Sequence, residues 1–422
     1  VQVRMRLAQY AGQTVQIRFR SDPGDSPHLD YVFLSEPTVS TPSWTPRRLV
    51  LLFADTLRPD HLGAYGYERQ TSPALDRLAE QGVVYEQIRS IAPWTLPAAR
   101  AALTGRQPEE WRDARRLPTI LAENGWQTSA LVSNAFLSPE FGMGAEWGLY
   151  RYQFLATAED TVDAAINELA RNPRTDSAIL VHFMEPHMPY EETEPYRSMW
   201  AGDDPPGFED GVSLIEIEGL PKTMTPAERT TYRTYLQDRY DQNIRAMDDQ
   251  IGRLLRRLPA DATVVLYSDH GEEFWEHGGI EHGHALWEEV VRVPLIIRSP
   301  NLVPGRVSRA GSLLDLTPTL LSLLGIETDI DFVGQDLNGD EDPLPVAIGR
   351  VLRGAEAWAV VHEDKKWITR RGRHIEFDLT TDPNERSDQW SRHQAGPPAE
   401  ATHLAEALGR QIVPVLHRQG EV

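Results

Sequence analysis

From Leu49 onward, short apolar runs alternate with segments that carry helix signals, and this alternation restricts the fold more than any other feature. Five runs are short, apolar and nearly continuous: Leu49–Phe53, Thr128–Val132, Ala178–Phe183, Thr263–Tyr267 and Leu295–Arg298. Such runs are typical of strands in a sheet that helices cover on both faces. We therefore predict an α/β fold with a doubly wound, mostly parallel sheet.

Capping residues between these runs indicate where helices begin. The pair Ser72-Pro73 predicts the start of one helix. A capping-box pattern at Thr225 predicts a second, long helix that ends near Leu258. The apolar segment Leu313–Leu324 predicts a third helix.

The two ends of the chain follow other patterns. Apolar and polar residues alternate near the N-terminus, so we predict a partial β-sandwich segment and linker over residues 1–46. Residues 47–335 hold the strand and helix alternation. Short strand patterns at Ala357–His362, Lys366–Thr369 and His374–Asp378, followed by a helix over Pro398–Leu416, predict a C-terminal α+β subdomain over residues 336–422.

Charge and composition exclude several function classes. The 422 residues include 63 acidic and 42 basic residues, for a net charge of −21. A chain this acidic repels nucleic acids, so an anionic substrate needs a local positive centre such as a metal ion. Cysteine is absent, which excludes disulfides and thiolate metal sites. The chain contains no apolar run of about 18 residues, so the sequence predicts no membrane span.

Carboxylates and imidazoles follow three of the predicted strands. Asp55 follows the first run, Glu185 and His187 follow the third, and Asp269 and His270 follow the fourth. Ligands in open α/β sheets bind beyond the carboxyl ends of the strands. Asp with His is a common ligand set for zinc or manganese. The alternative is that these residues only cap loops and turns.

Histidines concentrate in the segment after the fourth predicted strand. His270, His277, His282 and His284 lie within 15 residues, a density that favours a functional site over scattered surface residues. Gly271 allows a sharp backbone turn directly after His270.

The segment APWTLPAARAALTG places a hydroxyl at the start of a predicted helix. Thr95 precedes Pro97, which suits a first helical turn. Backbone N–H groups and the helix dipole favour an anionic ligand at such a position. The alternative is that Thr95 is only an N-cap.

Taken in order, these segments resemble the sulfatase branch of the alkaline phosphatase superfamily. FADTLRPDHLGAYG looks like that family's first metal motif, and WTLPAARAALTG stands at its nucleophile motif. LVHFMEPHMPY, SDHGEEFWEHG, WEEVVRVPLII, LLDLTPTLLSLLGI and FDLTTDPNE follow in the family's order. The resemblance covers roughly Leu49 to Trp390 and implies that residues 47–335 are the catalytic domain. The first 40 residues are similar to the last strands of a jelly-roll module.

The resemblance implies one divalent metal ion held by Asp55, Asp269 and His270, with Thr95 as both nucleophile and ligand. Zinc or manganese is the expected ion, and calcium is a further option. In the family the nucleophile forms a covalent intermediate, which is then hydrolysed or passed to an acceptor. His187, with His282 or His284, is expected to line the pocket, where one histidine binds a substrate oxygen and another protonates the leaving group.

Several positions depart from the family pattern. Thr95 stands where sulfatases carry the cysteine or serine that becomes formylglycine, and threonine cannot form that aldehyde. Thr56 replaces a metal-motif Asp, His270 replaces an expected Asn, and Ser133 falls at a lysine of the family. The three lysines of the chain, Lys222, Lys365 and Lys366, all lie elsewhere. With threonine at this position and Asp and His as expected ligands, the chain instead resembles phosphoethanolamine and glycerol-phosphate transferases and related phosphodiesterases.

The leading hypothesis is therefore a metal-dependent hydrolase of a phosphate or sulfate ester, with phosphate preferred. The substrate is a small-molecule, glycan or lipid-headgroup ester. The alternatives are a phospho-headgroup transferase and a non-catalytic glycan-binding relative. Analogy with jelly-roll-bearing relatives predicts an extracytoplasmic location, periplasmic or secreted.

Overall fold

The computed structural model describes residues 45–390, except 172–173, 191–193, 201, 203, 209–216, 218–219 and 221–223. The predicted N-terminal strands and the predicted last helix lie outside the described residues. Residues Pro46–Val422 form one compact unit, and the following description concerns that unit alone.

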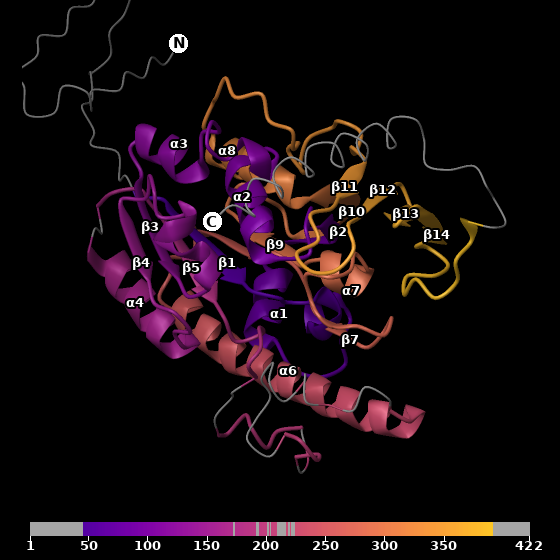
Figure 1. Cartoon of the computed structure of the whole chain (residues 1–422). Coiled ribbons are helices and arrows are strands. Elements are labelled where there is room, and N and C mark those ends of the chain that lie inside the picture. The colour runs from indigo at the N-terminus through magenta and orange to yellow at the C-terminus, as the bar shows by residue number, and fades with distance from the viewer. Residues whose placement is uncertain are drawn as a thin grey trace, which may run out of the picture. The chain divides into compact units, whose positions relative to one another are not determined.

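An eight-stranded sheet in the order β10-β2-β9-β6-β1-β5-β3-β4 forms the centre (Figure 1). All neighbouring strands are parallel except β9, which is antiparallel to β2 and β6. The mostly parallel α/β prediction is confirmed, and the five predicted runs are β1, β3, β5, β6 and β9. The strands are β1 (Arg48–Ala54), β2 (Val83–Arg89), β3 (Gln127–Val132), β4 (Leu149–Tyr152), β5 (Ser177–Phe183), β6 (Thr263–Ser268), β9 (Leu295–Arg298) and β10 (Gly305–Ser312).

Helices connect these strands and begin where the capping residues predicted. Thr225 makes both bonds of a capping box, and α1 has Pro73 in its first turn. No helix in the described part of the chain is long and apolar enough to cross a membrane. The α-helices are α1 (Pro73–Glu80), α2 (Thr95–Thr104), α3 (Leu117–Glu123), α4 (Ala158–Arg171), α6 (Pro226–Leu255), α7 (Glu288–Val291) and α8 (Leu316–Leu324). Short 3-10 turns are η2 (Pro59–His61), η3 (Gly63–Tyr65), η4 (Pro108–Glu110), η5 (Ala135–Leu137), η6 (Pro139–Phe141) and η7 (Leu313–Asp315).

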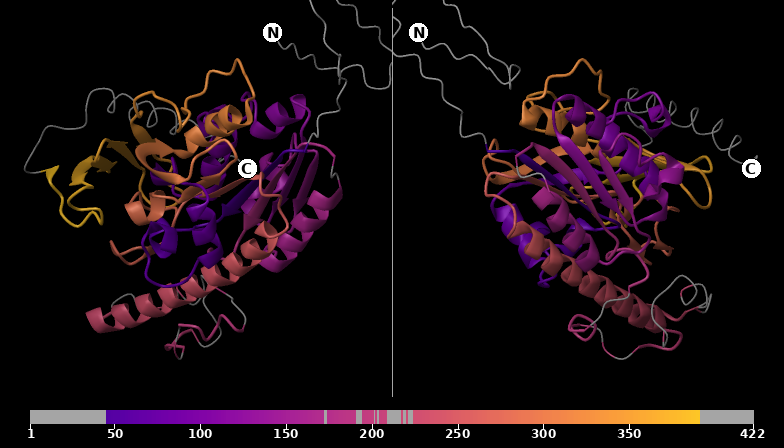
Figure 2. Two further views of the ribbon diagram at one scale, coloured as in Figure 1. Left: turned by 180° about the vertical axis from the view of Figure 1, so that it is seen from behind. Right: turned by 90° about the vertical axis from the view of Figure 1, so that its left-hand side faces the viewer.

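The sheet separates two apolar cores, as the continuous strand runs require. Successive side chains of a strand point to opposite faces, so Leu51 and Phe53 of β1 join one core and Val50 and Leu52 join the other. Helices α2, α3 and α8 cover the first face, and α1, α4 and α6 cover the second (Figure 2). The covered faces leave the carboxyl edge of the sheet as the place for polar side chains.

A second, antiparallel sheet follows the central one, as predicted for the C-terminal part. Its strands are β11 (Val346–Ile348), β12 (Ala357–His362), β13 (Lys365–Arg370) and β14 (Arg373–Asp378). It shares an apolar core with Val290 and Val291 of α7. A small hairpin, β7 (Glu273–Phe274) with β8 (Ile280–Glu281), lies between β6 and α7 in the chain.

Candidate active site

The register of two central strands brings two carboxylates together. Ala54 of β1 pairs with Ser268 of β6, so Asp55 and Asp269 leave the sheet side by side. Both side chains are fully buried. Asp55 and Asp269 lie side by side because the carboxyl ends of neighbouring parallel strands meet at the same edge of a sheet.

Asp55, Asp269 and His270 converge on one point. One ligand atom from each lies within 4.8 Å of the other two. His270 Nε2 is 3.2 Å from Asp269 Oδ2 and 3.7 Å from Asp55 Oδ1. These three residues are the ligand set expected from the sequence.

Thr95 reaches the same point from α2. Its Oγ1 lies 3.4 Å from His270 Nε2. The N-cap of α2 is Trp94, which makes no side-chain capping bond, so Thr95 is the first helical residue. The interpretation of Thr95 as an N-cap is therefore wrong. The uncapped N–H groups of the first turn favour negative charge beside the Thr95 hydroxyl.

Two further side chains, Asn134 and His182, contact these residues, and the sequence analysis missed both. Asn134 Nδ2 donates to Asp55 Oδ2 at 2.7 Å and to Thr95 Oγ1 at 3.3 Å. Its Oδ1 accepts from Phe136 N, which fixes the amide orientation. His182 Nε2 lies 3.1 Å from Asp55 Oδ2. Asn134 follows β3 closely, so the rule that found Asp55 could have found it, whereas His182 lies inside β5 and gives no such signal.

The arrangement fits a divalent cation. Asp55 Oδ1 and Asp269 Oδ2 are buried and find no hydrogen-bond partner among the described residues. His270 Nδ1 lies 3.0 Å from the Gly271 carbonyl oxygen and can donate its proton there, so that Nε2 would face a bound cation. Two carboxylates, an imidazole and a hydroxyl form a donor set that zinc and manganese accept.

Electrostatics favour positive charge at this point. Burial lowers the pKa of His270, but the Asp269 and Asp55 carboxylates and the Gly271 carbonyl raise it to about 9. Burial raises the pKa of Asp55, yet the His182 hydrogen bond and the nearby His187 and His270 bring it well below its usual range. The Asp55 carboxylate therefore offers negative charge to a cation.

The backbone around the ligands is tightly constrained. Thr56 has a φ of 54°, an uncommon conformation for a β-branched residue, and its carbonyl accepts from the Tyr240 hydroxyl at 2.7 Å. Gly271 donates its N–H to Val290 O, and a Cβ at Gly271 would lie 2.1 Å from Glu289 O. Only glycine fits where the loop of Asp269 and His270 passes α7.

We expect Gly271→Ala to lower the free energy of unfolding by about 1–3 kcal/mol or more, because backbone must move to admit the methyl group. Denaturant unfolding measures the change. Gly305→Ala is the control, since its nearest neighbour would be 4.0 Å away. Equal stability of the two variants would contradict the close packing.

Of the three predicted pocket histidines, His282 and His187 lie beside the ligand group. The His282 ring centroid is 4.3 Å from that of His270 and 5.0 Å from that of His187. Its Nδ1 is 3.2 Å from Glu272 Oε1. Burial and the charge of His270 place the pKa of His282 well below its usual value.

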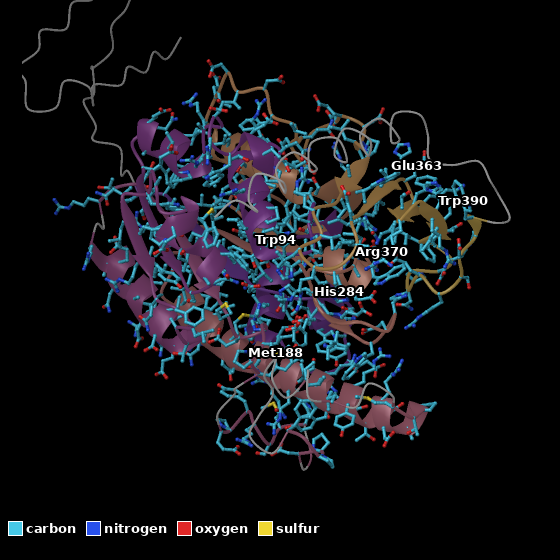
Figure 3. All side chains as sticks on the ribbon, viewed as in Figure 1. Trp94, Met188, His284, Glu363, Arg370 and Trp390 are labelled. Carbon is cyan, nitrogen blue, oxygen red and sulfur yellow. The ribbon has the colours of Figure 1, made fainter. Side chains whose placement is uncertain are left out.

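The remaining predicted residues have other partners. His284 Nε2 lies 2.9 Å from Glu273 Oε2. Trp94 and His284, both labelled in Figure 3, come from the start of α2 and from the segment between β8 and α7. Glu185 accepts from the N–H of Ala158 at the start of α4, so it serves as a helix cap. His277 joins a different cluster, with Glu289 and Glu385.

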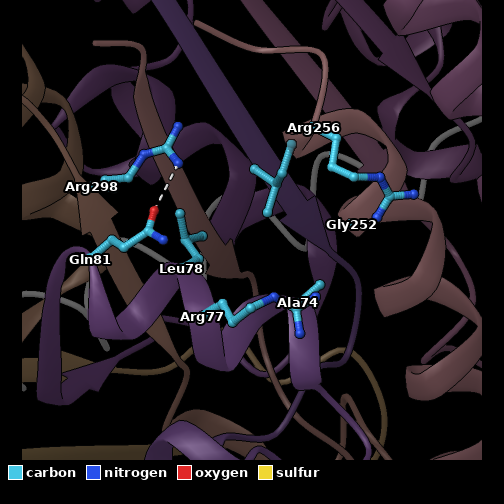
Figure 4. Close-up of a pocket in the computed structure, with 8 residues that line it drawn as sticks. Ala74, Arg77, Leu78, Gln81, Gly252, Arg256 and Arg298 are labelled. Carbon is cyan, nitrogen blue, oxygen red and sulfur yellow. Dashed lines mark hydrogen bonds between the residues drawn. The ribbon is translucent and has the colours of Figure 1, made fainter. Parts of the chain in front are cut away.

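A hollow of about 220 Å³ lies away from these residues. Arg298 lines it and ends β9, where it pairs with Val264 near the start of β6 (Figure 4). Asp269 follows the other end of β6. The hollow and the site of Asp55, Asp269 and His270 therefore lie at opposite ends of the strands.

Comparisons with known proteins agree with this fold. The family model described as Sulfatase matches residues 47–326. A Formosa agariphila protein named "Sulfatase" is 22% identical over 61% of the chain, and the chain spans 65% of its length.

Two solved structures show the same fold. BT4656 in complex with its substrate D-glucosamine-2-N,6-O-disulfate has a TM-score of 0.68 at 19% identity, covering 87% of this chain and 98% of that one. The phosphonate monoester hydrolase of Agrobacterium radiobacter has a TM-score of 0.66 at 17% identity, covering 88% and 96%.

Proposed function

Because the chain belongs to the sulfatase family, a family of ester hydrolases, we propose that it cleaves a phosphate or sulfate ester through a covalent intermediate on Thr95. One observation carries the proposal: the Thr95 hydroxyl lies 3.4 Å from His270 Nε2, at the point where Asp55 and Asp269 converge. The substrate is a small-molecule, glycan or lipid-headgroup ester, and the protein acts outside the cytoplasm.

The site residues divide the work as follows. Asp55, Asp269, His270 and Thr95 would hold one divalent ion, with zinc or manganese preferred over calcium. When bound, such an ion lowers the pKa of a hydroxyl and stabilises negative charge on the transferred group. Asn134 orients the Thr95 hydroxyl through the 3.3 Å hydrogen bond.

The reaction proceeds in two displacements. The Thr95 hydroxyl gives its proton to water, and the Thr95 oxygen forms a bond to phosphorus or sulfur while the bond to the leaving oxygen breaks. A pocket histidine gives its proton to that leaving oxygen. Water then attacks the same phosphorus or sulfur, which releases phosphate or sulfate and restores the threonine hydroxyl.

Two features support phosphate as the preferred ester. Threonine cannot become formylglycine, so the sulfatase nucleophile is not available at position 95. Lys366 is buried against Glu288 and Glu385, at 2.9 Å from each, and so does not provide a sulfate-binding ammonium at the site.

A substrate panel tests the proposal. The purified protein, loaded with Zn²⁺ or Mn²⁺, is assayed with nitrophenyl phosphate, bis-nitrophenyl phosphate and nitrophenyl sulfate. We expect turnover of a phosphate ester to exceed that of the sulfate ester. Faster sulfate hydrolysis would overturn the preference, and no turnover of any ester with either ion would overturn the proposed hydrolase.

Among His187, His282 and His284, we expect one to supply the leaving-group proton. Its alanine variant should lose the acid-catalysis limb of the pH–rate profile and about 10²–10⁴-fold in turnover of a poor leaving group. His374→Ala, on the C-terminal sheet, is the control. Unchanged profiles for all three variants would exclude this role.

A further inference from the structure

We propose that His277, Glu289 and Glu385 form a second divalent-cation site, distinct from the group of Asp55, Asp269 and His270. His277 lies between β7 and β8, Glu289 belongs to α7, and Glu385 follows β14 (Figure 1). The site would join the C-terminal sheet region to the loops of the central domain. It does not depend on the proposed ester hydrolysis.

The three donor atoms have chelating geometry. One atom from each side chain lies within 4.8 Å of the other two. His277 Nε2 and Glu289 Oε1 are 3.3 Å apart. Ligand atoms about 2.0–2.2 Å from one ion are separated by about 3 Å or more, so this spacing needs little adjustment.

Two of the donor atoms, His277 Nε2 and Glu289 Oε1, are buried and make no hydrogen bond with the described residues, while Glu385 Oε1 meets Lys366 Nζ at 2.9 Å. The side chains of Glu289 and Glu385 are 7% and 0% exposed. Buried polar atoms nearly always find a partner, so these two converging exceptions indicate a ligand.

Neighbouring contacts hold the donors in place. The His277 ring stacks on Trp287 at 4.1 Å between centroids and 16° between planes. Glu385 Oε2 accepts from the backbone N–H of Glu288 at 2.6 Å, which fixes the orientation of the Glu385 carboxylate. Such orienting contacts are typical of metal ligands.

The local charges leave room for a cation. Lys366 Nζ lies 2.9 Å from Glu385 Oε1 and also pairs with Glu288, which Arg89 contacts as well. Two cations thus balance Glu288 and Glu385, and among the described residues Glu289 has only His277 within ion-pair distance. Burial raises the pKa of Glu289 to about 8, a penalty that a bound ion would relieve.

The donor types select the class of ion. One imidazole nitrogen and two carboxylate oxygens suit Zn²⁺ or Mn²⁺, whereas Ca²⁺ prefers six or more oxygens. The Glu289 carbonyl accepts from Glu272 N at 3.1 Å, so an ion here would also stiffen the segment that follows His270.

Zinc stoichiometry tests the proposal in a background that lacks the first site, Asp55→Asn/Asp269→Asn. Chain stripped by a chelator is dialysed against Zn²⁺, and bound metal is measured by mass spectrometry. We expect two equivalents in the wild type, one in the background, and none after adding His277→Gln. The matched control, His374→Gln in the same background, should keep one equivalent.

Melting temperature provides a second readout. Zn²⁺ should raise the melting temperature of the background variant and leave that of the added His277→Gln variant unchanged. If the His277→Gln protein does not fold, Glu289→Gln takes its place. A background that binds no zinc, or an added variant that still binds one equivalent, would overturn the site.

Discussion

Replacing Thr95 by alanine should reduce turnover by at least about 10³-fold, because the variant lacks the oxygen that forms the covalent bond. Thr95→Ser should retain partial activity, since serine keeps a hydroxyl at the start of α2. Mass spectrometry during turnover of a slow substrate should detect a phosphoryl or sulfuryl adduct on the peptide that contains Thr95. The metal should remain bound through Asp55, Asp269 and His270, with lower affinity.

Thr104→Ala is the matched control for this experiment. Thr104 ends the same helix, and among the described residues its hydroxyl bonds only to the backbone of Arg100 and Arg106. Near-full turnover by Thr95→Ala would contradict covalent catalysis. Water would then be the attacking group, and Thr95 would only shape the start of α2.

Asp269→Asn should abolish turnover and release the metal equivalent held at the first site. The substitution keeps the side-chain shape but removes one of the two buried carboxylates that would face the proposed cation. Loss of a residue that only hydrogen-bonds to a metal ligand lowers metal affinity about 10–100-fold. Loss of a charged ligand itself should lower the affinity by more than this. Calorimetric titration with Zn²⁺ or Mn²⁺ measures the affinity.

Asp176→Asn provides the comparison, since Asp176 is also nearly buried but pairs with Arg47 beside the start of β1 and β5. It should keep both metal binding and turnover. Unchanged metal affinity in Asp269→Asn would exclude Asp269 as a ligand.

The sequence alone predicted the central strands because they are buried on both faces and therefore read as continuous apolar runs. It did not predict β4 or β10, whose residues are partly exposed at the sheet edges, or β2, where half-buried Glu86 and Gln87 interrupt the apolar run. It also did not predict that β9 runs antiparallel, because an apolar run carries no sign of its direction.

The candidate ligands Asp55, Asp269 and His270 were predictable because each lies within three residues after a predicted strand, and parallel strands bring their carboxyl ends to one edge. Only the tertiary structure decided what surrounds them. His182 faces Asp55 because β5 pairs with β1 in one register, and Asn134 reaches Thr95 from a loop 39 residues away in the chain. Glu385 meets His277 only because the C-terminal sheet packs on α7, a contact that no local pattern encodes.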